Sequence, residues 1–154
     1  MTRSRRVALV CSSGGHLAQL LVLRPWWEQL DRFWVTFDKP DARGALVGER
    51  RYACYFPTNR NLWNFARNSV LAFRILRRER PVLVVSTGAG VAVPFFVLGK
   101  LLFGTRTIYV EVVDRVDRPT LTARLVQRFC DRLLVQWPEQ QALYRQALLI
   151  GRLL

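Results

Sequence analysis

The sequence has few of the side chains that most often bind metals or attack substrates. It contains one histidine and three cysteines in 154 residues. Cys11, Cys54 and Cys130 are odd in number and widely spaced, and each lies in or beside an apolar segment. This pattern is not typical of a disulfide framework or a zinc site, and it indicates three buried thiols in a reducing compartment. We therefore expect no metal and no cofactor.

Acidic residues are also scarce. Lys and Arg number 24 against 11 Asp and Glu, which gives a formal net charge of +13. Such an excess favours an anionic partner: nucleic acid, an anionic membrane surface or a phosphorylated substrate. Lys39 and Lys100 are the only lysines, and the arginines that make up the rest of the cations suit bidentate contacts to phosphate.

A long uninterrupted hydrophobic run is missing as well. The longest nearly uncharged stretch, residues 82–103, contains "STGAG", Pro94 and Lys100, whereas a membrane-spanning helix needs about 20 consecutive apolar residues. The start "MTRSRRVALVCSS" has only a short apolar core before Gly14, which is not typical of a signal peptide. We expect neither a signal peptide nor a membrane span.

What the sequence does have is an alternation of short apolar runs and helical patterns. The apolar runs predict strands at 6–12, 33–38, 52–57, 81–86, 105–111 and 131–137. A helical pattern begins at residue 15 and is interrupted by Pro25, a second covers 61–80, and a short connection passes through 40–49. Strands that are apolar throughout have both faces covered. We therefore predict one α/β domain over residues 1–154, a Rossmann-like parallel sheet with helices on both faces.

Two strand-to-helix turns are rich in glycine. "SSGGH" (12–16) follows the first strand and "STGAG" (86–90) follows the fourth. Glycine allows a ligand to approach the backbone, and a helix start offers free N–H groups, so such turns bind anions. Two turns on one sheet edge favour a phosphate or diphosphate ligand, although the dinucleotide fingerprint is absent. His16 lies in the first turn and is a candidate hydrogen-bonding group or general base.

Four segments in this order resemble a known family: "SSGGHLAQLL", "VVSTGAGVAVPFFVLGK", "TIYVEVVDRVDRPTLTARLV" and "LVQWPEQ". The chain is similar to the acceptor-recognising, membrane-associated subunit of the two-part N-acetylglucosaminyltransferase of dolichol-linked oligosaccharide assembly. It resembles still more the bacterial counterparts of capsule and exopolysaccharide pathways. A more distant similarity is to the N-terminal half of the peptidoglycan lipid N-acetylglucosaminyltransferase.

The resemblance implies that the chain is the N-terminal half of a split, inverting GT-B glycosyltransferase. It would hold a polyprenyl-diphosphate-linked sugar, would need a separate subunit that binds the UDP-sugar donor, and would be inactive alone. Glu111, at the end of a strand, could hold a sugar hydroxyl or orient His16, the candidate base. By motif position, the acceptor site would be lined by Ser13, Gly14, Gly15 and His16, faced by Thr87, Gly88, Ala89 and Gly90.

The helical pattern at 61–80 suggests how the chain meets a membrane. Arg67, Arg74 and Arg78 share a stripe at i, i+7 and i+11. The apolar face of this segment, which includes Leu62, Trp63, Phe65, Val70, Phe73 and Leu76, is broader than a core stripe. A basic, aromatic helix can lie in an anionic membrane interface. The eukaryotic members of the family begin with a hydrophobic anchor that "MTRSRRVAL" does not match, so we expect peripheral attachment, at the cytoplasmic face of a bacterial inner membrane.

Two other functions fit part of the pattern. A basic nucleic-acid-binding domain would explain the charge, but no nucleic-acid motif appears and the aromatics lie mostly in apolar segments. A stand-alone nucleotide-binding α/β domain would explain the turns, but no acid–base pair emerges from the spacing. We expect no nucleic-acid partner. The apolar C-terminal residues 137–154 exceed what a free tail should expose, and they are a candidate docking surface for the donor subunit.

Overall fold

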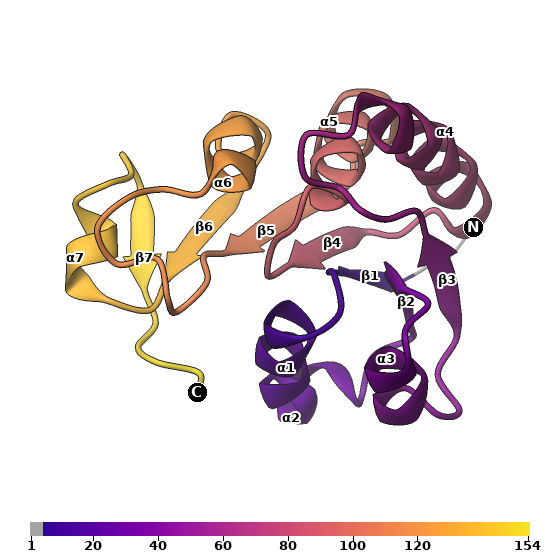
Figure 1. The fold of residues 1–154 in the computed structure, drawn as a ribbon, viewed down its shortest axis with the longest axis horizontal. Coiled ribbons are helices and arrows are strands. Elements are labelled where there is room, and N and C mark those ends of the chain that lie inside the picture. Colours follow the sequence, from indigo (N-terminus) through magenta and orange to yellow (C-terminus); the bar gives the residue numbers. More distant parts are fainter. Residues whose placement is uncertain (1–4) are drawn as a thin grey trace.

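The computed structural model describes residues 5–154, which form one seven-stranded sheet (Figure 1). All neighbouring strands are parallel, in the order β3-β2-β1-β4-β5-β6-β7. The sequence prediction of a Rossmann-like parallel sheet is therefore confirmed. The strands are β1 (Val7–Val10), β2 (Arg32–Phe37), β3 (Arg51–Cys54), β4 (Leu83–Ser86), β5 (Arg106–Val110), β6 (Arg132–Val135) and β7 (Ala147–Leu149).

Helices cover both faces of this sheet, as predicted. Figure 1 shows α1 to α3 on one face and α4 to α6 on the other, with α7 beside β7. The helices are α1 (Gly15–Val22), α2 (Arg24–Trp27), α3 (Pro40–Ala45), α4 (Leu62–Glu79), α5 (Ala92–Phe103), α6 (Leu121–Val126) and α7 (Pro138–Gln141). The strand order reverses direction between β1 and β4, because the chain leaves β1 toward β2 and later returns to β4.

The two faces of the sheet bury two separate apolar clusters. Successive side chains of a strand point to opposite faces, and β1 shows the division clearly. Val7 and Leu9 pack in the cluster that includes α1 and α3, whereas Ala8 and Val10 pack in the cluster that includes α4, α5 and α6. Because both clusters are closed by helices, the central strands β1 and β4 are apolar at nearly every position.

Three local expectations were wrong. The stretch through 40–49 contains helix α3, which begins at Pro40, a residue that suits the first turn of a helix. The C-terminal stretch 137–154 contains a seventh strand that was not expected: Leu148 and Leu149 belong to β7 and pair with β6, and both stay about half exposed. Cys130 is only partly buried, unlike Cys11 and Cys54.

The expectations about the N-terminus fall partly outside the described residues, which begin at residue 5. Within residues 5–154, no helix combines the length and the apolar character that crossing a bilayer requires.

Candidate functional site

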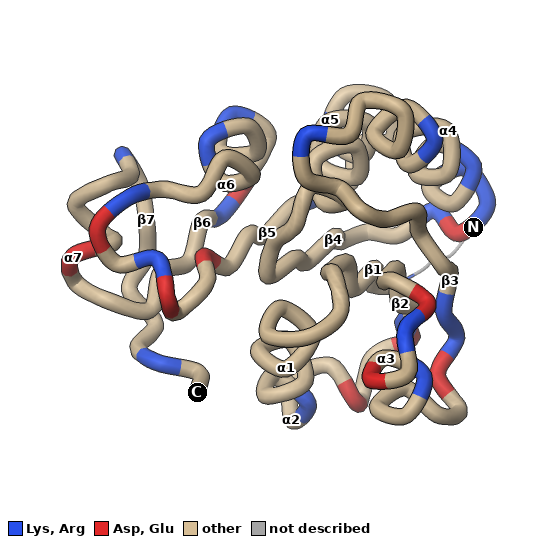
Figure 2. Tube along the Cα trace, in the orientation of Figure 1, with Lys and Arg blue, Asp and Glu red and all other residues tan. Residues whose placement is uncertain are grey.

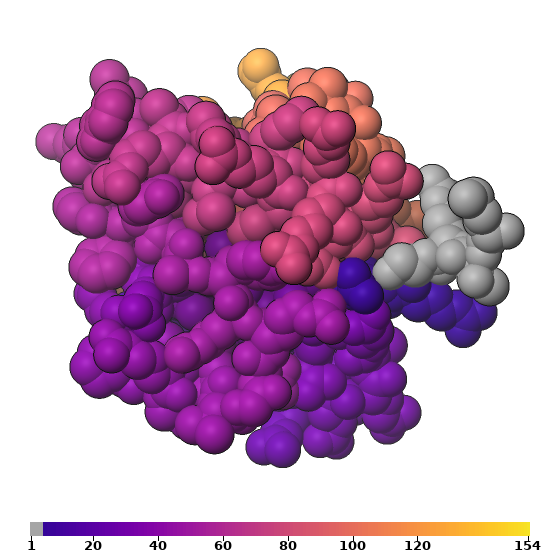
Figure 3. All heavy atoms as spheres, turned by 90° about the vertical axis from the view of Figure 1, so that its right-hand side faces the viewer, coloured from indigo at the N-terminus to yellow at the C-terminus, as the bar shows by residue number. Residues whose placement is uncertain are grey.

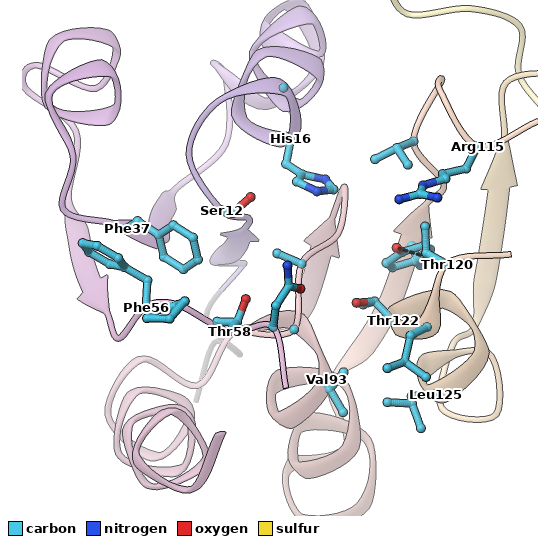
Figure 4. A pocket seen from close by; sticks show the side chains of 18 of the residues that line it. Ser12, His16, Phe37, Phe56, Thr58, Val93, Arg115, Thr120, Thr122 and Leu125 are labelled. Atoms are coloured by element: carbon cyan, nitrogen blue, oxygen red, sulfur yellow. Dashed lines mark hydrogen bonds between the residues drawn. The ribbon is translucent and has the colours of Figure 1, made fainter. Parts of the chain in front are cut away.

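A cavity of about 1370 Å³ opens along the carboxyl ends of the strands (Figure 4). Its walls come from the loops after β1, β2, β3, β4 and β5 and from the helices α1, α4, α5 and α6. The centre of the cavity lies at the ends of β1 and β4, where the strand order reverses, and open α/β sheets bind ligands at such a point. Small-molecule sites usually measure about 300–1,000 Å³, so this cavity can hold a large ligand.

The two glycine turns meet through His16 and Thr87. The Nδ1 atom of His16 lies 2.8 Å from the Thr87 carbonyl oxygen, and the Thr87 hydroxyl donates to the His16 carbonyl at 2.6 Å. Because a carbonyl only accepts, Nδ1 carries the proton in this bond. In the neutral ring, Nε2 is then free to accept a proton. The ring faces the cavity (Figure 4).

The glycines of these turns serve different purposes. Gly88 has a φ of +125°, and a Cβ at this position would lie 2.7 Å from His16 Cε1. Only glycine therefore lets the second turn lie against the imidazole. A Cβ on Gly15 would meet no atom within 4 Å, although Gly15 lines the cavity. Gly14, the N-cap residue of α1, has no side chain to cap the helix, and its own N–H donates to the Asp41 carboxylate at 2.7 Å. The N–H groups of the first helical turn, which follow Gly14, are the ones that an anion in the cavity can approach.

The cavity is lined by three cations and one carboxylate. Lys39 lies over the Phe56 ring at 5.0 Å, Arg60 lies in the loop before α4, and Arg115 and Asp114 lie in the loop after β5. Arg60 and Ala89, which both line the cavity, have positive φ values of 48° and 74°. Such backbone angles are costly for residues other than glycine and concentrate at functional sites.

Glu111 does not fill either role expected for it. Its side chain is fully buried and does not line the cavity. Its carboxylate accepts hydrogen bonds from the Val112 and Thr120 N–H groups, the Thr120 hydroxyl and the Tyr144 hydroxyl, and His16 bonds to Thr87 instead. Burial and the neighbouring Glu111 charge raise the pKa of Tyr109 well above its usual range. Through its bonds to Val112 and Thr120, Glu111 holds the loop after β5 in place from its buried side.

The "QWPEQ" segment supports the same loop. The Gln140 amide donates to the carbonyl oxygens of Val112 and Arg115 at 2.7 and 3.0 Å. The Trp137 indole donates to the Val113 carbonyl at 2.7 Å. Gln136 donates to the Glu111 carbonyl at 2.9 Å and to the Gln19 side chain at 2.5 Å. The cavity wall that carries Arg115 is thus held by residues at the start of α7.

The sequence placed the site at the correct sheet edge but did not identify most of its lining. Four of the predicted residues line the cavity: Gly15, His16, Ala89 and Gly90. Five are not among its lining residues: Ser13, Gly14, Thr87, Gly88 and Glu111. Gly14, for example, donates its N–H to Asp41 at 2.7 Å. Sequence reasoning missed Lys39, Arg60 and Arg115, for which only the excess of positive charge was a signal.

Helix α4 presents a mixed basic and apolar surface to solvent. Arg67, Arg74 and Arg78 are exposed, as is Trp63, whose side chain is 72% accessible. Leu76 belongs instead to the core. Figure 2 shows the basic positions along α4, and Figure 3 shows α4 (magenta to pink) over the upper part of this side of the molecule. Arg67 stacks on the Tyr55 ring at 3.6 Å.

Solved structures with the same fold define the class of this domain. MurG from Acinetobacter baumannii superposes with a TM-score of 0.77 over 94% of this chain and 45% of that chain, at 15% identity. UDP-GlcNAc 2-epimerase from Methanocaldococcus jannaschii superposes with a TM-score of 0.71 over 96% of this chain and 45% of that chain, at 12% identity. The chain is a Rossmann-like domain of the kind that forms the N-terminal half of GT-B glycosyltransferases.

Sequence comparison identifies the family. The model of the family described as "Oligosaccharide biosynthesis protein Alg14 like" matches residues 56–153, and the chain belongs to this family. The UDP-N-acetylglucosamine transferase subunit ALG14 of Yarrowia lipolytica is 34% identical over 50% of this chain and 38% of its own length. The human subunit of the same name is 29% identical over 64% of this chain and 44% of its own length. The chain thus spans half or less of the curated relatives that it matches.

Proposed function

We propose that this chain is the acceptor-binding, membrane-recruiting subunit of a two-component inverting glycosyltransferase. The pair transfers N-acetylglucosamine from its UDP derivative to a polyprenyl-diphosphate-linked sugar. The observation that carries this proposal is the cavity at the ends of β1 and β4, which combines the start of α1 with three cations. The names of the relatives, UDP-N-acetylglucosamine transferase subunits, supply the donor and the reaction.

The acceptor diphosphate binds beside Gly15, where the backbone is bare and the start of α1 attracts anions. Lys39, Arg60 and Arg115 line the same cavity and neutralise part of the diphosphate charge. Ala89 and Gly90 form the opposite side of this subsite. Gly14, Thr87, Gly88 and Glu111 support it through the backbone and hydrogen bonds described above, and Ser13 adjoins it in the first turn.

His16 acts as the general base. Its Nδ1–H bond to Thr87 orients the ring and leaves Nε2 toward the cavity. Nε2 takes the proton of the acceptor hydroxyl while the oxygen of that hydroxyl attacks the anomeric carbon of the donor sugar, and UDP leaves on the opposite side. A base at this position requires the acceptor sugar to reach from the diphosphate to His16 within the same cavity.

The donor half of the reaction is supplied by a separate subunit. GT-B neighbours of known structure are about twice the length of this chain, which covers 45% of MurG. In-line transfer needs the leaving diphosphate and the acceptor hydroxyl held together, and the partner binds the UDP-sugar. Family membership favours this function over nucleic-acid binding or a stand-alone nucleotide-binding domain.

The pair works at the cytoplasmic face of a bacterial inner membrane, to which this chain attaches peripherally. The exposed face of α4 carries arginines beside Leu62, Trp63, Val70 and Phe73, all of which are 40% or more accessible. Basic and aromatic side chains on one helix face suit the interface of an anionic bilayer.

A transfer assay tests this function. The purified chain is supplied with UDP-N-acetylglucosamine and a polyprenyl-diphosphate-linked sugar, with and without the donor-binding subunit. We expect transfer only with both subunits, and His16→Ala should reduce kcat by about 100-fold or more because a positioned base contributes about that factor. Robust transfer by this chain alone would contradict the two-component proposal, and normal kcat in His16→Ala would contradict the role of the base.

A further inference from the structure

The cavity has two ends of different chemistry. Figure 4 shows His16 and Arg115 at one end, and Val93 and Leu125 at the other, with Thr120 and Thr122 between them. The second end is apolar and is formed by three helices, α4, α5 and α6. Its lining residues are Leu62, Phe65, Val93, Leu121 and Leu125.

Most of these apolar side chains are exposed to solvent. Leu62 is 84% accessible, Leu121 is 70% and Leu125 is 47%. In α6, the residues that pack in the core are Ala123 and Val126, which lie on the other side of the helix from Leu121 and Leu125. Leu121 and Leu125 lie four residues apart and therefore share one face of α6, which borders the cavity. An exposed apolar surface gathered at the mouth of a cavity indicates a binding site.

We propose that this apolar end, which we call the lipid groove (Leu62, Phe65, Val93, Leu121 and Leu125), binds the first isoprene units of the acceptor. The inference rests on the proposed function and adds to it the part of the acceptor that these residues recognise. Charge decides the occupant. A free nucleotide would leave the groove empty, and an apolar molecule would leave Arg115, at the other end of the cavity, without an anionic partner. A polyprenyl diphosphate satisfies both ends at once.

The groove leads from the cavity toward the exposed face of α4. Leu62 is both a residue of the groove and the first residue of α4. The outward face of α4 then continues with Trp63, Arg67 and Val70, all exposed. A lipid chain that leaves the cavity past Leu62 therefore reaches the face that we assign to the membrane, and the rest of the chain can stay in the bilayer while its diphosphate lies in the cavity.

The test compares two acceptors that differ only in lipid length: one with a full polyprenyl chain and one with a single isoprene unit. Both are assayed in detergent with the complete pair, so that docking to a bilayer does not limit the rate. We expect Leu121→Ser/Leu125→Ser to lower the ratio of kcat/KM for the long over the short acceptor by about tenfold, because apolar contact with the chain is lost. The single variant Leu121→Ser should lower it by less.

The matched control is Leu101→Ser/Leu102→Ser. These leucines of α5 are 65% and 60% accessible and lie outside the cavity lining, so the ratio should keep its wild-type value. An unchanged ratio in the groove variants, with circular dichroism showing intact folds, would overturn the groove and leave the proposed function standing. An equal fall in the control would also overturn it. Failure of the wild-type pair to use either acceptor would instead contradict the proposed function.

Discussion

Substituting Gly15 by alanine should make the protein more stable and less active. The added Cβ meets no atom within 4 Å, and Gly15 is the first residue of α1. Alanine in a helix is favoured over glycine by about 0.5–1 kcal/mol. We expect the lower value at this terminal position, so the free energy of unfolding should rise by about 0.5 kcal/mol. Urea denaturation followed by circular dichroism measures this change.

The same methyl group occupies the space assigned to the acceptor diphosphate. Moving bound substrate by about 1 Å can cost about 100-fold in rate, so kcat/KM of the assembled pair should fall by about that factor. Gly15→Val should reduce it further. Gly15→Ala with full activity would refute the placement of the diphosphate beside this turn, and a loss of stability would refute the conclusion that the space is open.

Gly88→Ala provides the contrast, because it should lower both the free energy of unfolding and the kcat/KM of the assembled pair. A residue other than glycine at a φ of +125° costs about 1–3 kcal/mol. The new Cβ would also displace the His16 ring, which lies 2.7 Å away, and so weaken its bond to Thr87. We expect a fall of about 2 kcal/mol in the free energy of unfolding together with a loss of activity. The two variants thus distinguish a glycine that leaves space for a ligand, Gly15, from a glycine that packs against another side chain, Gly88.

Two further predictions concern charge. Replacing Arg67, Arg74 and Arg78 by serine should remove about 3 kcal/mol of attraction to anionic vesicles, at about 1 kcal/mol for each arginine. Vesicle flotation measures this change. At high salt the wild type and the variant should bind equally, because salt screens the attraction. The control replaces three exposed arginines outside α4: Arg128, Arg132 and Arg145; an equal loss there would show that net charge alone drives attachment. Glu79→Gln should destabilise the fold by about 2 kcal/mol at neutral pH, because the buried carboxylate accepts from Arg6 at 2.6 Å and from Arg50 at 3.3 Å. Burial raises the pKa of Glu79, but Tyr52, Arg6 and Arg50 outweigh this effect and lower the pKa. The stability advantage of the wild type over Glu79→Gln should therefore be complete above about pH 5 and fade as acid protonates Glu79 in the folded state. A difference in the free energy of unfolding that does not change with pH would contradict this.

The sheet and the edge that carries the site could be predicted from the sequence because both follow from local patterns. Apolar strands separated by helical segments specify a parallel sheet, and in such a sheet every strand ends at the same edge. The two glycine turns therefore had to lie on one side of the molecule. The contact between His16 and Thr87 follows from this geometry, since β1 and β4 are direct neighbours.

The role of Glu111 could not be predicted in this way. A carboxylate that ends a strand at the ligand edge has the same sequence pattern whether it faces a cavity or a loop. Its actual partners, Thr120 and Tyr144, lie 9 and 33 residues away, and no spacing rule brings them to it. The same holds for Arg60 and Arg115, which reach the cavity only because long loops fold over the sheet edge.

The support of the loop after β5 by the start of α7 has a consequence for how the site comes into being. Almost every residue of the cavity wall precedes residue 126, yet the wall is held in place by Gln136, Trp137 and Gln140. The bond between Gln19 and Gln136 joins positions 117 residues apart. During synthesis from the N-terminus, the growing chain therefore contains nearly all the groups that would touch a ligand well before it can arrange them. The segment that follows β6 completes a pocket to which it contributes hardly any surface.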